Sequence, residues 1–115
     1  TEKDHVSPWP SVYKIHQLTA AEITFALTSG GHNAGIVSEP GHPRRHYALQ
    51  TRAANGPWVD PEAWRRSAPR VEGSWWTAWH AWLLAHGEGR KFKAVPLTGG
   101  LCDAPGTYVH VCYRD

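Results

Sequence analysis

The stretch from Phe25 to Gly35 constrains the fold of this chain more than any other. An alternating apolar run ends there at two glycines, and His32 follows between small residues. Small residues permit a tight turn, because glycine adopts backbone angles that other residues avoid. The stretch therefore predicts a buried strand that presents an imidazole from the turn at its carboxyl end.

The strand itself is expected from Glu22 to Thr28. Ile23, Phe25 and Leu27 share one face, and small or weakly polar residues occupy the other. A period of two with β-branched and aromatic residues is typical of a strand. Because neither face is strongly polar, we expect both faces to be covered, as in a parallel sheet.

A carboxylate precedes this stretch, in the segment from Asp4 to Trp9. An acid followed by a histidine matches the last two members of an α/β-hydrolase triad, in which the nucleophile comes first. In such a triad the acid holds the imidazole in one tautomer, and the imidazole takes a proton from a thiol or hydroxyl. The pattern alone also allows His32 to be an ordinary turn residue.

The sequence contains no usable nucleophile. A nucleophile elbow reads Gly-x-Ser/Cys-x-Gly, and this pattern does not occur in the chain. Cys102 comes nearest, but it follows His32, and Ala104 stands where the second glycine belongs. We therefore expect this chain to be the C-terminal part of a larger α/β domain and to supply the acid and the histidine of a split triad. The chain would then be catalytically incomplete by itself.

Proline positions and helical periodicity define the expected start of the chain. Residues 1–10 are expected to form a loop, because Pro8 and Pro10 exclude regular structure. A short helix is expected over residues 11–18, with Ser11 as its N-cap. Its apolar face would consist of Val12, Ile15 and Leu18.

The remainder of the chain is expected to contain two helices and one more strand. Residues 29–57 are predicted to be a long irregular segment with an extended piece from Tyr47 to Gln50. Helices are expected from Asp60 to about Ser67 and from Ser74 to His86, where capping and periodicity agree. Alternation from Thr107 to Tyr113 predicts a terminal or edge strand.

Composition excludes several classes of function. The chain has 115 residues and a formal net charge of +2, without the continuous basic face that binds nucleic acid. No run approaches the roughly 18 apolar residues of a membrane span. Its two cysteines, Cys102 and Cys112, are too few for a secreted disulfide framework. We expect Cys112 to be a small buried thiol in a cytoplasmic protein.

The other histidines do not form a convincing metal site. His42 and His46 are close in sequence, but Pro43 disfavours a helix that would place them on one face. No acid or cysteine cluster completes a tetrahedral ligand set. We expect exposed loop histidines there and no bound metal.

Tryptophan is unusually abundant, with seven residues in this short chain. Each indole buries a large area and needs a partner for its N–H, so we expect most of them to pack. Trp75 and Trp76 are adjacent and should point in different directions on a helix. One of them is therefore a candidate for contact with a partner chain, a missing segment of the protein or an apolar ligand.

With these residues assembled, the chain resembles the C-terminal part of polyhydroxyalkanoate synthases, the poly-3-hydroxybutyrate polymerases. The motifs Asp-His-x-x-Pro-Trp and Gly-His-x-Ala-Gly, followed by Gly-Ser-Trp-Trp, are a specific combination. Asn33 departs from the family, in which an apolar residue commonly follows the histidine. The matching stretches cover nearly the whole chain in the family's order: Lys3–Trp9, Phe25–Gly35, Gly73–Trp76 and Ala104–Val109.

The resemblance implies that residues 1–115 are the C-terminal segment of one α/β-hydrolase-like catalytic domain. That fold would contain a mostly parallel sheet with flanking helices, a tryptophan-rich helix and a late edge strand. It also implies a Cys-Asp-His triad, in which Asp4 and His32 match the acid and the histidine and the cysteine lies upstream. Asp4 would either orient His32 or help deprotonate the 3-hydroxyl of the incoming unit. His5 and Asn33 would lie at the substrate mouth.

The implied reaction links (R)-3-hydroxyacyl groups from coenzyme A thioesters into a polyester, without a cofactor. Expected partners are the thioester, the growing polyester, the surface of a cytoplasmic polymer granule and a second copy in a homodimer. Two other functions stay open at this point. One is an esterase or depolymerase that uses the same Asp–His pair. The other is a non-catalytic fragment that binds a partner or a granule through its tryptophans.

Overall fold

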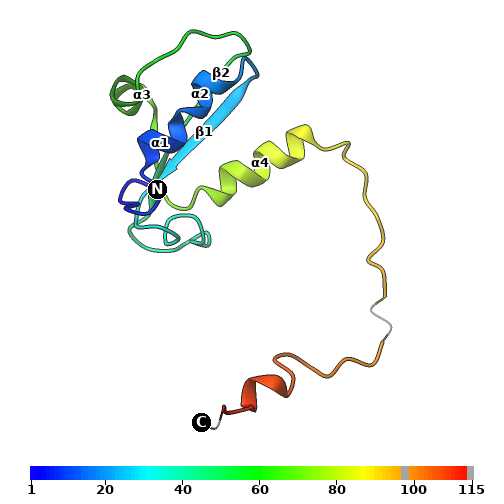
Figure 1. Ribbon diagram of the computed structural model, residues 1–115. Coiled ribbons are helices and arrows are strands. Elements are labelled where there is room, and N and C mark those ends of the chain that lie inside the picture. Colours follow the sequence, from blue (N-terminus) through cyan, green and yellow to red (C-terminus); the bar gives the residue numbers. More distant parts are fainter. Residues whose placement is uncertain (97–98, 114–115) are drawn as a thin grey trace.

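The computed structural model describes residues 1–96 and 99–113. Figure 1 shows short helices around a small sheet, from which residues 88–96 and 99–113 lead away as an extended arm. The elements in chain order are α1 (Trp9–Tyr13), α2 (Ile15–Leu18), β1 (Ile23–Thr28), β2 (His46–Arg52), α3 (Pro61–Ser67), β3 (Arg70–Glu72), α4 (Trp76–His86) and the 3-10 helix η1 (Tyr108–His110).

The three strands form an antiparallel sheet in the order β1-β2-β3. The strand expected at 22–28 is confirmed as β1, and the extended piece expected at 47–50 belongs to the longer β2. The described strands do not form the expected parallel sheet. A parallel pair needs a crossover connection, usually a helix, whereas only turns and coil connect β1 to β2. The chain therefore returns antiparallel.

One face of β1 packs against an aromatic core. The ring of Phe25 lies edge-on to Trp64 of α3, with ring centroids 5.2 Å apart, and edge-on to Tyr13 of α1 at 5.1 Å. Burying each large apolar side chain contributes roughly 1.5–3 kcal/mol. The buried cluster on this face comprises Trp9, Tyr13, Leu27, Trp64 and Ala68.

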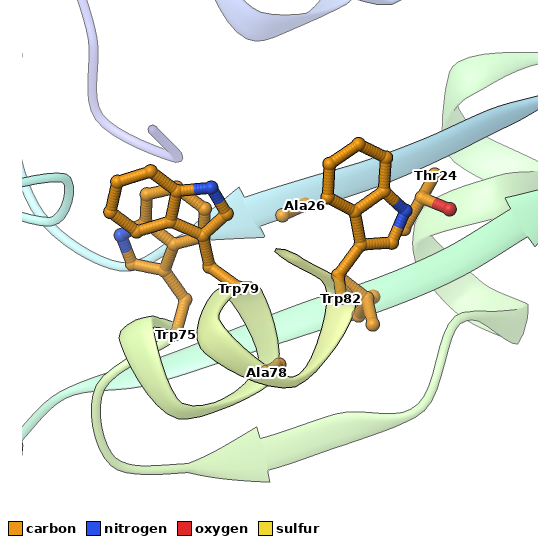
Figure 2. Close-up of a pocket in the computed structure, with 7 residues that line it drawn as sticks. Thr24, Ala26, Trp75, Ala78, Trp79 and Trp82 are labelled. Carbon is orange, nitrogen blue, oxygen red and sulfur yellow. The ribbon is translucent and has the colours of Figure 1, made fainter. Parts of the chain in front are cut away.

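The other face of β1 lies under the tryptophans of α4. Trp75, Trp79 and Trp82 line a pocket of about 200 Å³ together with side chains of β1 and β2, as Figure 2 shows. Trp75 and Trp79 stack with ring centroids 5.2 Å apart. The expectation that both faces of this strand are covered is met only in part, because Thr24 and Ala26 are half-buried and line this pocket.

The helix expected over 11–18 is wrong in its start and in its face. α1 begins at Trp9 with Pro8 as N-cap, and the helical path breaks at Lys14 before α2. The residues expected to face the core are exposed, at 52% for Val12, 42% for Ile15 and 79% for Leu18. The buried residues are instead Trp9, Tyr13 and His16, whose larger rings remove more surface from water.

The two later helices are confirmed. Asp60 caps α3 by accepting a hydrogen bond from the Ala63 backbone N–H at 3.0 Å, as its sequence signal indicated. α3 ends at Ser67, and α4 runs to His86. No helix in the described ranges 1–96 and 99–113 has the length and apolar character needed to cross a membrane.

The strand expected over 107–113 is wrong. This segment contains the short helix η1, and Tyr108, Val109 and Val111 are exposed. Alternation becomes a strand only when a neighbouring strand completes its hydrogen bonds, and the described sheet ends at β1 and β3. Cys112, expected to be a buried thiol, is exposed for the same reason.

Arg52 ties the end of β2 to the segment that leads into β1. Its guanidinium donates hydrogen bonds to the backbone carbonyls of His16 at 2.7 Å, Thr19 at 2.8 Å and Ala21 at 3.0 Å. Hydrogen bonds from a charged donor are stronger than neutral ones. The guanidinium therefore satisfies carbonyls that the short helix α2 leaves free.

The buried His16 makes the stability of this core sensitive to acid. Burial, reinforced by the positive charge of Arg52, lowers the pKa of His16. A lowered folded-state pKa means that the contribution of His16 to stability is complete above the unfolded value of about 6.5 and falls as the pH drops below it.

The melting temperature of the parent should therefore fall between about pH 7.5 and about pH 5.5, and we expect a smaller fall for His16→Phe in the whole protein. The matched variant His42→Phe, at a more exposed histidine, should behave like the parent, and equal losses for both variants would contradict the prediction.

Candidate active site

The Asp4 carboxylate is fixed by its own loop. Its Oδ1 accepts hydrogen bonds from the backbone N–H groups of Val6 at 2.9 Å and Ser7 at 2.8 Å. The pKa of Asp4 is lowered to about 2, and the hydrogen bond from the Ser7 N–H is the largest cause. Burial acts in the opposite direction and raises the pKa, while the hydrogen bond with His32 lowers it further. Asp4 is therefore an anion throughout the neutral range.

The first residues of the chain hold this loop beside the end of β1. The backbone N–H of Glu2 donates to the Thr28 carbonyl at 2.9 Å, and that of Lys3 donates to the Gly30 carbonyl at 3.0 Å. Residue numbers rise together along both segments, which is the parallel sense. The Asp4 loop is thereby attached to the turn that carries His32.

The turn after β1 depends on glycine at two positions. Gly30 has a φ of +105°, a conformation that side chains with a Cβ rarely adopt. At Gly35 an added Cβ would lie 2.1 Å from the Ser29 carbonyl oxygen. The chain can therefore fold back onto the end of β1 only without a side chain at Gly35.

Asp4 and His32 meet as the sequence predicted. His32 Nδ1 lies 3.0 Å from Oδ1 and 3.0 Å from Oδ2 of Asp4. The Asp4 side chain is 7% exposed and that of His32 is 46% exposed. An anionic partner at Nδ1 favours a proton there, which leaves Nε2 as the basic nitrogen. Within residues 1–96 and 99–113, Nε2 makes no hydrogen bond, so it is free to act on a group from elsewhere.

The two other predicted site residues lie next to this pair in sequence. His5 and Asn33 are both exposed. The backbone carbonyl of Asn33 accepts hydrogen bonds from the N–H groups of Ile36 at 3.0 Å and Val37 at 3.1 Å. Asn33 therefore starts a helical turn directly after His32, and a role for either side chain at a substrate mouth stays a prediction.

His42 and His46, the two histidines weighed as metal ligands, each contact a carboxylate. His42 Nδ1 lies 3.2 Å from a Glu39 oxygen, and His46 Nε2 lies 3.1 Å from a Glu2 oxygen. His46 belongs to β2, so its expected place in an exposed loop is wrong. In the described part of the chain, no three His, Cys, Asp or Glu side chains gather as they would around a metal ion.

Sequence reasoning missed the contact between Glu2 and His46. The two residues are 44 positions apart, and no local pattern connects them. His46 also exchanges two hydrogen bonds with Ser29: its carbonyl accepts from the Ser29 N–H, and its N–H donates to the Ser29 hydroxyl. These contacts attach the start of the His32 turn to β2 and to the segment that carries Asp4.

The chain is similar to curated poly(3-hydroxyalkanoate) polymerases. It is 36% identical over 110 residues to poly(3-hydroxyalkanoate) polymerase 2 of Ectopseudomonas oleovorans, covering 92% of this chain and 19% of the relative. It is 35% identical over 115 residues to the poly(3-hydroxyalkanoate) polymerase of Methylorubrum extorquens, covering 96% of this chain and 18% of the relative. The family resemblance seen in the motifs is thus confirmed, and the chain spans just under a fifth of the length of these relatives.

Two other comparisons gave no match. No family model matches the chain, and no solved structure matches it.

The fit of Gly35 can be tested against a neighbouring glycine. We expect Gly35→Ala to cost about 1–3 kcal/mol, because its Cβ would collide with backbone, and to lower the melting temperature of the whole protein by a few degrees. Gly31→Ala is the matched control, since a Cβ there would meet no atom within 4 Å. Equal melting temperatures for the two variants would show that the turn does not need the close approach at Gly35.

Proposed function

We propose that this chain is the acid-and-histidine segment of a polyhydroxyalkanoate synthase, an acyltransferase that polymerises (R)-3-hydroxyacyl groups from coenzyme A thioesters. The observation that carries the proposal is the Asp4–His32 pair, with Nδ1 held 3.0 Å from both carboxylate oxygens. The similarity to poly(3-hydroxyalkanoate) polymerases over 92–96% of the chain supports it. The nucleophile of the proposed Cys-Asp-His triad belongs to the rest of the longer protein.

In the proposed reaction, His32 Nε2 removes the proton from the cysteine thiol. The thiolate attacks the thioester carbonyl, the carbon–sulfur bond to coenzyme A breaks, and the acyl group becomes bound to the enzyme. His32 gives its proton to the leaving coenzyme A thiolate. It then accepts the proton of the hydroxyl group that attacks the acyl-enzyme. The new ester bond extends the polyester, the carbon–sulfur bond to the cysteine breaks, and the released thiolate takes the proton back from His32.

The protonation state of Asp4 favours one of its two suggested roles. A carboxylate whose pKa is held near 2 is a weak base, and a hydroxyl proton needs a base with a pKa close to the working pH. A permanent anion at Nδ1 stabilises the imidazolium that forms when His32 takes a proton. We therefore assign Asp4 the role of orienting and stabilising His32.

Two features of β1 support an α/β-hydrolase-type sheet in the longer protein. β1 is an edge strand of the described sheet, and residues 2–3 bond in the parallel sense to its last residue, Thr28, and to Gly30 just beyond it. A parallel strand from the longer protein would satisfy the remaining backbone groups. The exposed apolar side chains of Val12, Ile15 and Leu18 offer a surface for the same domain to cover.

The proposed partners follow from the reaction. They are a 3-hydroxyacyl-coenzyme A and the growing polyester, and the relatives are named as polymerases of such polyesters. An apolar polyester separates from water as it grows, which favours an enzyme that stays at the surface of a cytoplasmic polymer granule.

The triad assignment predicts how two substitutions change turnover. In the full-length polymerase that contains this segment, we expect His32→Ala and Asp4→Ala to lower coenzyme A release by roughly a thousandfold or more. Release is measured with a thiol reagent and polymer formation by turbidity. His42→Ala, a loop histidine paired with Glu39, is the control and should keep the parental rate.

The products separate this function from hydrolysis. Polymer formed together with coenzyme A identifies a synthase, whereas free 3-hydroxy acid identifies a hydrolase that uses the same pair. Parental polymerisation by both His32→Ala and Asp4→Ala would overturn the triad assignment itself.

A further inference from the structure

The adjacent tryptophans at the start of α4 share one acceptor. Trp75 Nε1 donates a hydrogen bond to the Ile36 carbonyl at 3.0 Å, and Trp76 Nε1 donates to the same oxygen at 2.7 Å. The prediction that these side chains point in different directions is therefore wrong for their N–H groups. A carbonyl oxygen has two lone pairs, so the two indoles saturate this one.

Ile36 belongs to the helical turn that follows His32 directly. The Asn33 carbonyl accepts hydrogen bonds from the N–H groups of Ile36 and Val37. A displacement of the Ile36 peptide therefore moves the turn that begins beside the imidazole.

Ser74 adds a second attachment two residues further along the turn. Its hydroxyl accepts a hydrogen bond from the Trp76 backbone N–H at 3.1 Å and donates to the Ser38 carbonyl. The Ser38 hydroxyl in turn donates to the Ala34 carbonyl. Ser38 and Ser74 are 2% and 6% exposed, so water does not compete for these bonds.

A glycine turn and an indole stack support these donors. Gly73, with a φ of +103°, turns the chain from β3 into α4, and its N–H donates to the Arg45 carbonyl at 2.7 Å. The ring of Trp75 stacks on Trp79 above Ala26 of β1, as Figure 2 shows. The indole of Trp75 and the strand that precedes the His32 turn thus line the same pocket.

We infer that Ser74, Trp75 and Trp76 are positioning residues, which keep the imidazole of His32 aligned with Asp4 by fixing the turn over residues 33–38. This gives the Gly-Ser-Trp-Trp motif a task beyond packing. The kinetic consequence rests on the proposed function, because a shift of about 1 Å in a catalytic group can cost about a hundredfold in rate. The structural consequence does not depend on it.

Substitution of both indoles in the full-length polymerase tests this inference. Because the two N–H groups share one acceptor, we expect Trp75→Phe and Trp76→Phe each to lower kcat by about threefold and the double variant by at least about thirtyfold. KM for the thioester should change by less than about twofold, since no contact with substrate is removed. Ser74→Ala, with an expected loss of about fivefold in kcat, is a smaller change should the double variant fail to fold.

Trp82→Phe is the matched control. Trp82 lies on the same helix and lines the same pocket, and its indole N–H makes no hydrogen bond with residues 1–96 or 99–113. It exchanges one indole for a phenyl ring, as each single tryptophan variant does, and should keep the parental kcat. A kcat for the double variant and for Ser74→Ala that equals the kcat of Trp82→Phe would overturn the inference.

A second measurement does not depend on turnover. In the NMR spectrum of protein labelled with nitrogen-15 histidine, the chemical shifts of His32 Nδ1 and Nε2 report which nitrogen carries the proton. The signals of His32 are identified as those that His32→Gln lacks. We expect a proton on Nδ1 in the parent and in Trp82→Phe, and a mixture of tautomers in the double variant and in Ser74→Ala. If the parent makes no polymer but these shifts change as expected, the proposed function fails and the positioning role stands. Unchanged tautomers in folded variants would overturn that role.

Discussion

The position of β1 against the aromatic core is the constraint on which the rest of the structure depends. Phe25 and Leu27 pack into this core on one side, and on the other side Trp75, Trp79 and Trp82 line a pocket over the strand. A strand with one face in a core cannot slip by one residue without exchanging its two sets of side chains. Its carboxyl end is therefore a fixed point, and the groups that position His32 are attached to it.

Three chain segments converge on this fixed point. The segment before Asp4 bonds to the carbonyls of Thr28 and Gly30. β2 contributes the exchange of hydrogen bonds between His46 and Ser29, and the start of α4 contributes the donors to Ile36. Hydrogen bonds from these three segments thus add to the contact between Asp4 and His32 in fixing the position of the turn that carries His32. An exposed histidine is held in one orientation, although only one of its nitrogens has a protein partner among residues 1–96 and 99–113.

Local signals in the sequence were sufficient to predict β1, the turn that carries His32 and the start of α3. The alternation before Thr28, the glycines around His32 and the cap at Asp60 all act within a few residues, so they could be read without a structure. The buried face of α1 and α2 could not be predicted in this way. Val12 and Ile15 have the spacing of a buried face, but the larger rings of Trp9 and Tyr13 are buried instead because they pack against Trp64 of α3. The expected strand over 107–113 failed because its partner would have to come from elsewhere.

The anchors on either side of the loop between β1 and β2 have a consequence for how the site can diverge. Ser38 is tied to Ser74 at one end, and Arg45 accepts a hydrogen bond from Gly73 at the other. The residues between them, 39–44, are mostly exposed, and surface loops tolerate changes in length at small cost. Insertions and deletions can accumulate there without moving the imidazole. The loop over residues 39–44 is therefore free to evolve new lengths and shapes while the Asp4–His32 pair keeps its geometry.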